Sequence, residues 1–169
     1  MINIGILSDD SGHEIAGFIE NFLKNSIIRY KITENLRNVA MALDRKTGFD
    51  IIIVNFLREC DDIIFKEKVS CENFVLNSDV ISNNSSAMIL SRPPLTFGLN
   101  PKACVTASSL GSDSITCCIQ RSFFTIFNEQ VCQQEIVINI GCDESAAVSL
   151  LAATACGLLC GISPKNMRL

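Results

Sequence analysis

Short apolar runs alternate with a helical pattern through the first half of the chain. Ile2 to Leu7, Asp50 to Phe56 and Phe74 to Leu76 are continuous or nearly continuous apolar runs. Such runs are typical of parallel strands that are covered on both faces. Ile15 to Leu23 instead carries apolar residues at positions 15, 18, 19, 22 and 23, which is helical spacing. The pattern predicts an α/β fold with a mostly parallel sheet and flanking helices.

Weaker patterns predict further elements of the same kind. Ile27 to Thr33 is a candidate for a second strand, and Glu34 to Lys46 is a candidate amphipathic helix. Asp61 to Glu67 is long enough for a short helix. Ala87 to Leu90 and Leu95 to Phe97 are two more short apolar segments. Strands that alternate with helices in this way favour parallel βαβ units.

The second half changes to short strands separated by turns. Ala103 to Leu110, Ser114 to Arg121, Phe123 to Phe127 and Glu135 to Ile140 are the strand candidates. They predict a small antiparallel β meander within residues 103–140. We interpret residues 1–169 as one domain that contains both halves.

The chain closes with an uncharged segment, Ser145 to Ile162. Its length is near the lower limit for a membrane span, but it is rich in Ala, Gly and Ser and therefore only modestly hydrophobic. We interpret it as a buried helix over residues 143–161 that closes the domain, without a membrane association.

Composition narrows the classes of function. A formal charge of −4, a pI near 5.0 and scattered basic residues give no support to nucleic-acid binding. Nine cysteines include no C-x-x-C pair, and His13 is the sole histidine, so the spacing of a zinc site is absent. The sequence starts with a strand pattern and no basic leader. We therefore expect a cytoplasmic protein with mostly buried, reduced thiols.

The loop between the first strand and the first helix is the most informative segment. It reads Ser8-Asp9-Asp10-Ser11-Gly12-His13. Nucleotide enzymes of α/β type hold phosphate at this point with glycine amides, a lysine and the helix N-terminus. Here there is one glycine, no lysine and two adjacent carboxylates. Each carboxylate would oppose a polyphosphate at ~4 Å by roughly 1 kcal/mol in water, so we expect no ATP or Mg²⁺ cofactor.

The polar residues of this loop allow two interpretations. Ser11 to Glu14 fits a capping box, with Ser11 as the N-cap of the helix. In that interpretation, the carboxylates of Asp9 and Asp10 only interact favourably with the positive end of the helix dipole. In the other interpretation, Asp9 and Asp10 bind a divalent metal ion or a cationic ligand.

Four segments, taken in order, resemble the central, ATP-binding domain of the Mur ligases. Phe74 to Asp79 (FVLNSD) is similar to the family's "vvlNaDDp" strand end. Thr96 to Ala103 (TFGLNPKA) resembles its "tyGlnpkAdv" strand, and Val105 to Ser108 resembles the continuation "v.A.n". Leu151 to Ile162 is similar to the helix "HNvyNalAAiaaalelGi". The resemblance spans nearly the whole chain and implies the same fold.

The departures from the family pattern concern its chemistry. The family's G-T-N-G-K-T loop falls on Ser8 to His13, where its lysine, final threonine and most glycines are missing. Its H-N-x-x-N pattern falls on Ser145 to Ser149 (SAAVS). Asn55, Arg58 and Glu59 are the nearest candidates for its acidic metal-binding residue after the third strand. The resemblance thus implies a degenerate relative without a phosphate clamp, and it names no catalytic residue.

We therefore expect a protein that binds or regulates in connection with peptidoglycan precursor synthesis, more readily than an enzyme. Its partner would be another protein, such as a full-length Mur ligase, or a second copy of itself. An active or in-trans ATP-dependent UDP-N-acetylmuramyl peptide ligase component is the first alternative. The candidate ligand-binding residues stand at the expected carboxyl ends of parallel strands, where open α/β sheets place ligands: Asp9, Asp10, Ser11, Gly12, Asn55, Asn77 and Asp79.

A receiver-like signalling domain is the second alternative. Asp9 and Asp10 would be its acidic pair after the first strand. Such a domain needs an aspartate at the end of the 50–56 strand, because that carboxylate is the nucleophile of phosphoryl transfer. Asn55 stands at this point and lacks the required carboxylate.

Overall fold

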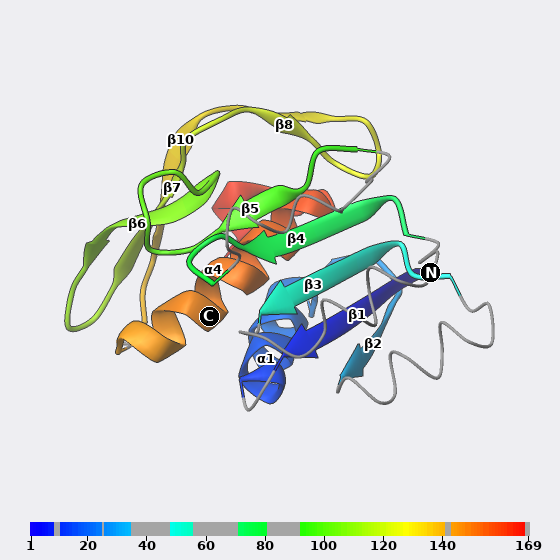
Figure 1. Ribbon diagram of the computed structural model, residues 1–169, viewed down its shortest axis with the longest axis horizontal. Coiled ribbons are helices and arrows are strands. Elements are labelled where there is room, and N and C mark those ends of the chain that lie inside the picture. Colours follow the sequence, from blue (N-terminus) through cyan, green and yellow to red (C-terminus); the bar gives the residue numbers. More distant parts are fainter. Residues whose placement is uncertain are drawn as a thin grey trace.

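Within the residues that it describes, the computed structural model contains an eight-stranded mixed sheet, two α-helices and a separate two-stranded hairpin (Figure 1). The strand order is β10-β7-β6-β5-β4-β3-β1-β2. The structure describes residues 1–8, 11–24, 26–34, 48–55, 71–80, 92–140 and 143–167. The mostly parallel α/β fold predicted from the sequence is confirmed.

Five strands form the parallel half of the sheet: β1 (Ile2–Ser8), β2 (Tyr30–Glu34), β3 (Ile51–Asn55), β4 (Asn73–Asn77) and β5 (Leu95–Phe97). Their order, 2-1-3-4-5, is that of a doubly wound sheet, and the order reverses between β1 and β3. Every residue of β3 is buried. β1, β3 and β4 have nearly continuous apolar sequence and are mostly buried, which is typical of parallel strands that are covered on both faces.

Three more strands continue the same sheet. β6 (Val105–Leu110) pairs with β5 in parallel, whereas β7 (Ile115–Ile119) and β10 (Gln134–Ile138) add as antiparallel strands. β8 (Phe123–Phe124) and β9 (Gln130–Val131) form the separate hairpin. The expected meander is therefore present and is joined to the parallel strands.

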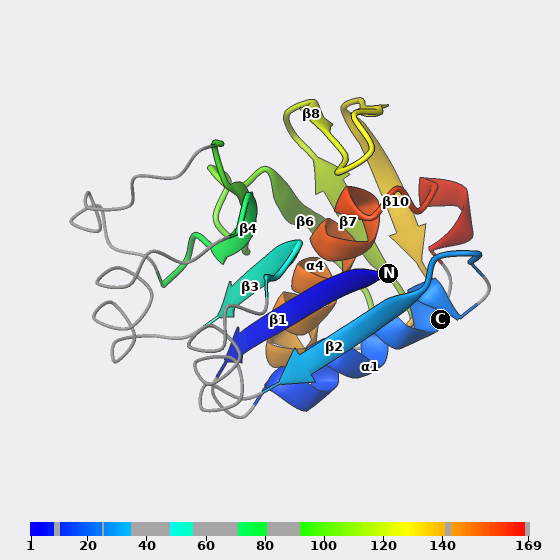
Figure 2. The same cartoon turned by 90° about the vertical axis from the view of Figure 1, so that its right-hand side faces the viewer.

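The two helices in the described residues pack against each other on the sheet (Figure 2). They are α1 (Gly12–Leu23) and α4 (Glu144–Leu159), and a short 3₁₀ turn, η1 (Pro164–Asn166), follows. The Asp143 side chain caps α4 by accepting a hydrogen bond from the Ala146 amide at 2.9 Å. Gly161, with φ of +84°, ends the helix. Its amide bonds to the Leu158 carbonyl and the next amide to the Gly157 carbonyl, which is a Schellman motif.

Several predicted elements need correction or lie outside the described residues. β2 begins at Tyr30 rather than Ile27, and Ile27 is fully exposed. The predicted strand over residues 123–127 keeps only two residues, because a turn with Asn128 at φ of +64° follows. The helices predicted at 34–46 and 61–67 lie essentially outside the described residues, as does the segment 87–90.

The sequence of α4 prompted the question of a membrane crossing. Within the described part of the chain, no helix has the combination of length and hydropathy that a span across a bilayer requires. In the fold, the apolar surface of α4 is buried against the sheet and against α1.

Leu151→Asp should prevent folding. Leu151 is 0% exposed in α4, so the change removes roughly 3 kcal/mol of packing and buries a carboxylate without a partner at a cost of several kcal/mol more. That sum is comparable with the ~5–15 kcal/mol by which domains are stable. Circular dichroism and urea unfolding would measure it.

The matched control is Val137→Asp, because Val137 is 60% exposed on β10. This variant should unfold within about 0.5 kcal/mol of wild type, as surface substitutions usually do. A folded Leu151→Asp protein of near wild-type stability would contradict the burial of α4.

Candidate functional site

Polar side chains meet at the carboxyl ends of β1, β3 and β4. Ser8 is the last residue of β1 and stands beside Asn55, the last residue of β3, in the strand register. Asn77 ends β4. The gap between β1 and β3 is the topological switch point, where doubly wound sheets bind their ligands. The sequence prediction names Asn55 and Asn77 as ligand-binding candidates, and the structure places them next to each other at these strand ends.

Ser8, Ser11 and Asn55 are linked by short hydrogen bonds. The Asn55 Nδ2 donates to Ser11 Oγ at 2.9 Å, and the two serine hydroxyls lie 2.6 Å apart. Ser8 Oγ donates to the Asn55 carbonyl at 3.2 Å. Since a serine hydroxyl has one proton, Ser11 is the donor toward Ser8. The three side chains thus tie the start of α1 to the ends of two strands.

The chain of hydrogen bonds continues to β4. Asn77 Nδ2 donates to Asn55 Oδ1 at 2.6 Å, and Asn77 Oδ1 accepts from the Asp79 amide at 2.8 Å. Asn55 is 8% exposed and Asn77 is 2% exposed. We call Ser8, Ser11, Asn55 and Asn77 the amide cluster. Both of its buried carboxamides have partners within the protein, as buried polar groups require.

Asp79 is used as an anchor for the loop after β5. Its carboxylate accepts from the Leu99 amide at 2.6 Å, from the Asn100 amide at 2.9 Å and from Asn100 Nδ2 at 2.7 Å. Gly98 makes this approach feasible, with φ of +150°. A Cβ at Gly98 would lie 2.6 Å from Asp79 Oδ1, so only glycine fits. The carboxylate that sequence reasoning offered as a ligand group therefore holds the backbone.

The capping-box prediction is wrong. Ser11 occupies the N-cap position of α1, but it has helical backbone angles (φ −83°, ψ −2°) and its side chain makes no capping bond. The hydroxyl is oriented into the amide cluster instead, where Ser8 and Asn55 are its partners. Gly12 follows as the first, buried residue of the helix. Asp9 and Asp10 lie outside the described residues.

Sequence reasoning missed two members of the site. The sequence places Ser8 only at the start of the loop, whereas its pairing with Asn55 in the register of β1 and β3 makes it part of the cluster. Asn100 donates to both Ser78 Oγ and Asp79 Oδ1, at 2.8 and 2.7 Å. Asn100 lies in the TFGLNPKA segment, so the resemblance of this segment to the Mur ligases is the feature of the sequence that could have indicated it.

The amide cluster is electrically neutral, and its side chains bond to one another and to the Asp79 amide. Hydroxyls and carboxamides can orient a ligand, but they supply neither a strong base nor a nucleophile at neutral pH. Within the part of the chain that the structure describes, no three His, Cys, Asp or Glu side chains are grouped so as to hold a metal ion. The chemistry offered here is hydrogen bonding.

Comparison with known proteins places the fold. No protein-family model matches the sequence, and no curated protein matches it. Among solved structures, the chain is similar to the UDP-N-acetylmuramoylalanyl-D-glutamyl-2,6-diaminopimelate–D-alanyl-D-alanyl ligase of Acinetobacter baumannii. The TM-score is 0.63 with 10% identity, covering 99% of this chain and 44% of that one.

Two further structures agree. A second structure of MurF from Acinetobacter baumannii has a TM-score of 0.61 at 10% identity, over 99% of this chain and 44% of that one. MurF of Thermotoga maritima in complex with ADP has a TM-score of 0.57 at 11% identity, over 98% and 47%. This chain thus has a Mur-ligase-like fold and spans less than half the length of these neighbours.

Asn77→Ala should destabilise the protein by about 2–3 kcal/mol. The change removes the partners of the buried Asn55 Oδ1 and of the part-buried Asp79 amide, and a buried group that is left unpaired costs about 1–3 kcal/mol. Asn73→Ala is the matched control, because the side-chain Nδ2 of Asn73 donates a hydrogen bond to the Asp50 carbonyl at an exposed position. Urea unfolding should show a loss below about 1 kcal/mol for the control. Equal losses of unfolding free energy in the two variants would mean that the buried amide cluster stabilises the fold no more than an exposed hydrogen bond does.

Proposed function

We propose that this chain is a non-catalytic, Mur-ligase-like protein with a binding or regulatory role linked to peptidoglycan precursor synthesis. The fold likeness to MurF ligases supports the link to that process. The residues at the switch point support the non-catalytic part. Because a fold alone does not fix a function, the proposal rests on these residues.

One observation carries the proposal. At the point where a nucleotide enzyme needs a lysine and free amide donors, this chain places the amide cluster, whose polar groups bond to one another. The loop Ser8 to His13 contains no lysine and adds two carboxylates. A polyphosphate would meet negative charge there and would have to break existing hydrogen bonds.

A second candidate is an ATP-dependent ligase component that keeps a modified nucleotide or metal site, or that acts in trans with a full ligase. Its support is the likeness to a MurF ligase in complex with ADP, together with two acids, Asp9 and Asp10, at the switch-point loop. The two candidates differ in one measurable property, which is the affinity for Mg-ATP.

In the proposed role, the function lies in contact with another protein. The carboxyl edge exposes Asp79, and the adjoining start of α1 exposes His13. His13 Nδ1 pairs with Glu34 Oε2 at 2.5 Å while 94% of its side chain stays exposed. A full-length Mur ligase or a second copy of this chain would contact this surface.

Mg-ATP should not bind. Titration calorimetry with the purified chain is expected to give no saturable heat up to millimolar nucleotide, because of the charge and pairing described above. ADP and a uridine-nucleotide muropeptide precursor should be titrated in parallel. A dissociation constant for Mg-ATP of tens of micromolar or better would establish the second candidate.

The partner prediction adds a negative charge at the start of α1. The wild-type chain should capture a Mur ligase from its native lysate, or should self-associate in sedimentation experiments, and His13→Glu should weaken this at least fivefold. Lys165→Glu is the control, because Lys165 is exposed on η1, beyond the far end of α4. If His13→Glu leaves the capture unaffected, the contact lies elsewhere on the chain. If the captured ligase hydrolyses ATP only when this chain is present, the in-trans ligase is favoured.

A further inference from the structure

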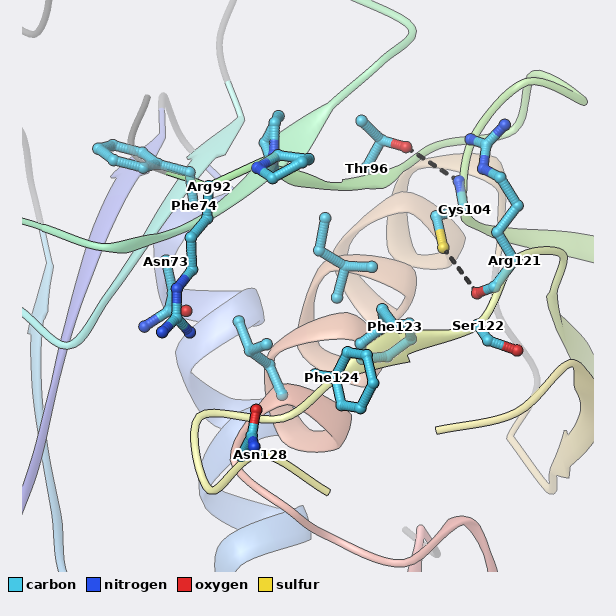
Figure 3. Close-up of a pocket in the computed structure, with 14 residues that line it drawn as sticks. Asn73, Phe74, Arg92, Thr96, Cys104, Arg121, Ser122, Phe123, Phe124 and Asn128 are labelled. Atoms are coloured by element: carbon cyan, nitrogen blue, oxygen red, sulfur yellow. Dashed lines mark hydrogen bonds between the residues drawn. The ribbon is translucent and has the colours of Figure 1, made fainter. Parts of the chain in front are cut away.

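A cavity of about 620 Å³, shown in Figure 3, lies at the amino ends of β4 and β5, whereas the amide cluster lies at the carboxyl ends of the strands. Its floor contains Asn73 and Phe74, which begin β4, and Leu95, which begins β5. The hairpin of β8 and β9 and the end of α4 complete the walls. A volume of this size falls in the range of ~300–1,000 Å³ that small-molecule sites occupy.

The wall on the hairpin side is held in place by hydrogen bonds. The Ile126 amide donates to the Leu159 carbonyl at 3.0 Å, which joins the hairpin to the last turn of α4. Thr125 Oγ1 accepts from the amides of Phe127 and Glu129 at 3.2 and 3.1 Å. The cavity is therefore a formed feature of the fold.

The opposite wall is tied together in the same way. The Cys104 amide donates to Thr96 Oγ1 at 2.9 Å, and the Cys104 thiol donates to the Arg121 carbonyl at 3.2 Å, as Figure 3 shows. Burial raises the pKa of the Cys104 thiol above its ordinary value. The Cys104 thiol is therefore neutral and does not act as a nucleophile.

The lining combines apolar surface with positive charge and contains no acidic residue. Phe123, Phe124, Pro93, Pro94 and Leu159 supply most of the apolar part. Phe124 is 59% exposed, whereas most of the chain's large apolar side chains for which exposure is known are buried. An exposed ring beside a cavity can stack on a planar ligand.

The two arginines of the lining are not equivalent. Arg121 Nη2 donates to the Lys102 carbonyl at 2.5 Å, and Figure 3 shows its guanidinium beyond Cys104, away from the phenyl rings. Arg92 extends along the wall that contains Asn73. Its ion pair with Glu72 is long, at 3.9 Å, and both side chains are more than half exposed. Such a pair contributes little and is readily exchanged for an incoming anion.

We propose that this cavity binds a small organic anion with a planar, apolar body, such as an aromatic carboxylate or sulfonate. The ring lies between the phenylalanines and the proline pair, and the anionic group pairs with the Arg92 guanidinium, which is suited to two parallel hydrogen bonds with such groups. This site is independent of the proposed function, because it shares no residue with the amide cluster.

The test uses 8-anilinonaphthalene-1-sulfonate, an aromatic sulfonate whose fluorescence rises on burial, and N-phenyl-1-naphthylamine, its uncharged analogue. Both should bind the wild-type chain. Arg92→Gln should weaken the sulfonate about tenfold, which is the usual effect of a lost charged hydrogen bond, and should leave the amine unchanged. Ser122→Trp, at an exposed lining position, should weaken both by filling the cavity.

The control is Arg29→Gln, because Arg29 is an exposed arginine before β2 and outside the cavity. It makes the same change in net charge and should leave both affinities within twofold. Sulfonate binding weaker than millimolar, equal effects of the two arginine variants, or amide chemical shifts that move outside residues 73–74, 92–96 and 121–128 would each overturn the proposal.

Discussion

Helix α4 is the element on which the rest of the structure depends, because it is apolar on all sides and must be surrounded. Leu150, Leu151, Ala152 and Ala153 are consecutive and all 0% exposed. One side of the helix lies on β3 to β7 and another on α1. The parallel and antiparallel halves of the sheet therefore share one core, and removing this helix would uncover both.

The small residues of α4 determine how closely its neighbours approach. At Gly157, a Cβ would lie 3.0 Å from Met167 and 3.6 Å from Phe22 of α1. The absence of a side chain there lets the chain end fold back over the helix and lets α1 pack alongside. At about 1.5 Å per residue, the 16 residues of α4 span roughly 24 Å. The last residue of the helix, Leu159, lines the cavity beside the amino ends of β4 and β5.

Local pattern was sufficient to predict most of the fold. The runs that became β1, β3 and β4, and the helical spacing of α1, are strong because full burial and a single apolar stripe leave clear signatures. Ser11 could not be assigned correctly from its neighbours. A hydroxyl at the N-cap can bond to its own helix or across to Asn55, and only the pairing of β1 with β3 decides between them.

The cavity was beyond prediction for the same reason. Its lining comes from segments as distant in sequence as Asn73, Arg92, Arg121 and Leu159, and no short motif marks them. Their proximity follows from the position of β4 and β5 beside the end of α4. By contrast, the candidate residues of the amide cluster could be named in advance, because carboxyl ends of parallel strands always share an edge.

The two edges of the sheet differ in what a ligand would have to displace. At the carboxyl edge, the buried amides of Asn55 and Asn77 already have partners at 2.6–2.9 Å, so a ligand gains only the difference between new and existing hydrogen bonds. At the other edge, Arg92 is engaged only by a long, exposed ion pair, and Phe124 still presents more than half of its surface to water. Desolvating that ring favours binding, and little is lost in return. Within the described part of the chain, the free energy available for a small ligand is therefore larger at the amino ends of β4 and β5 than at the switch point.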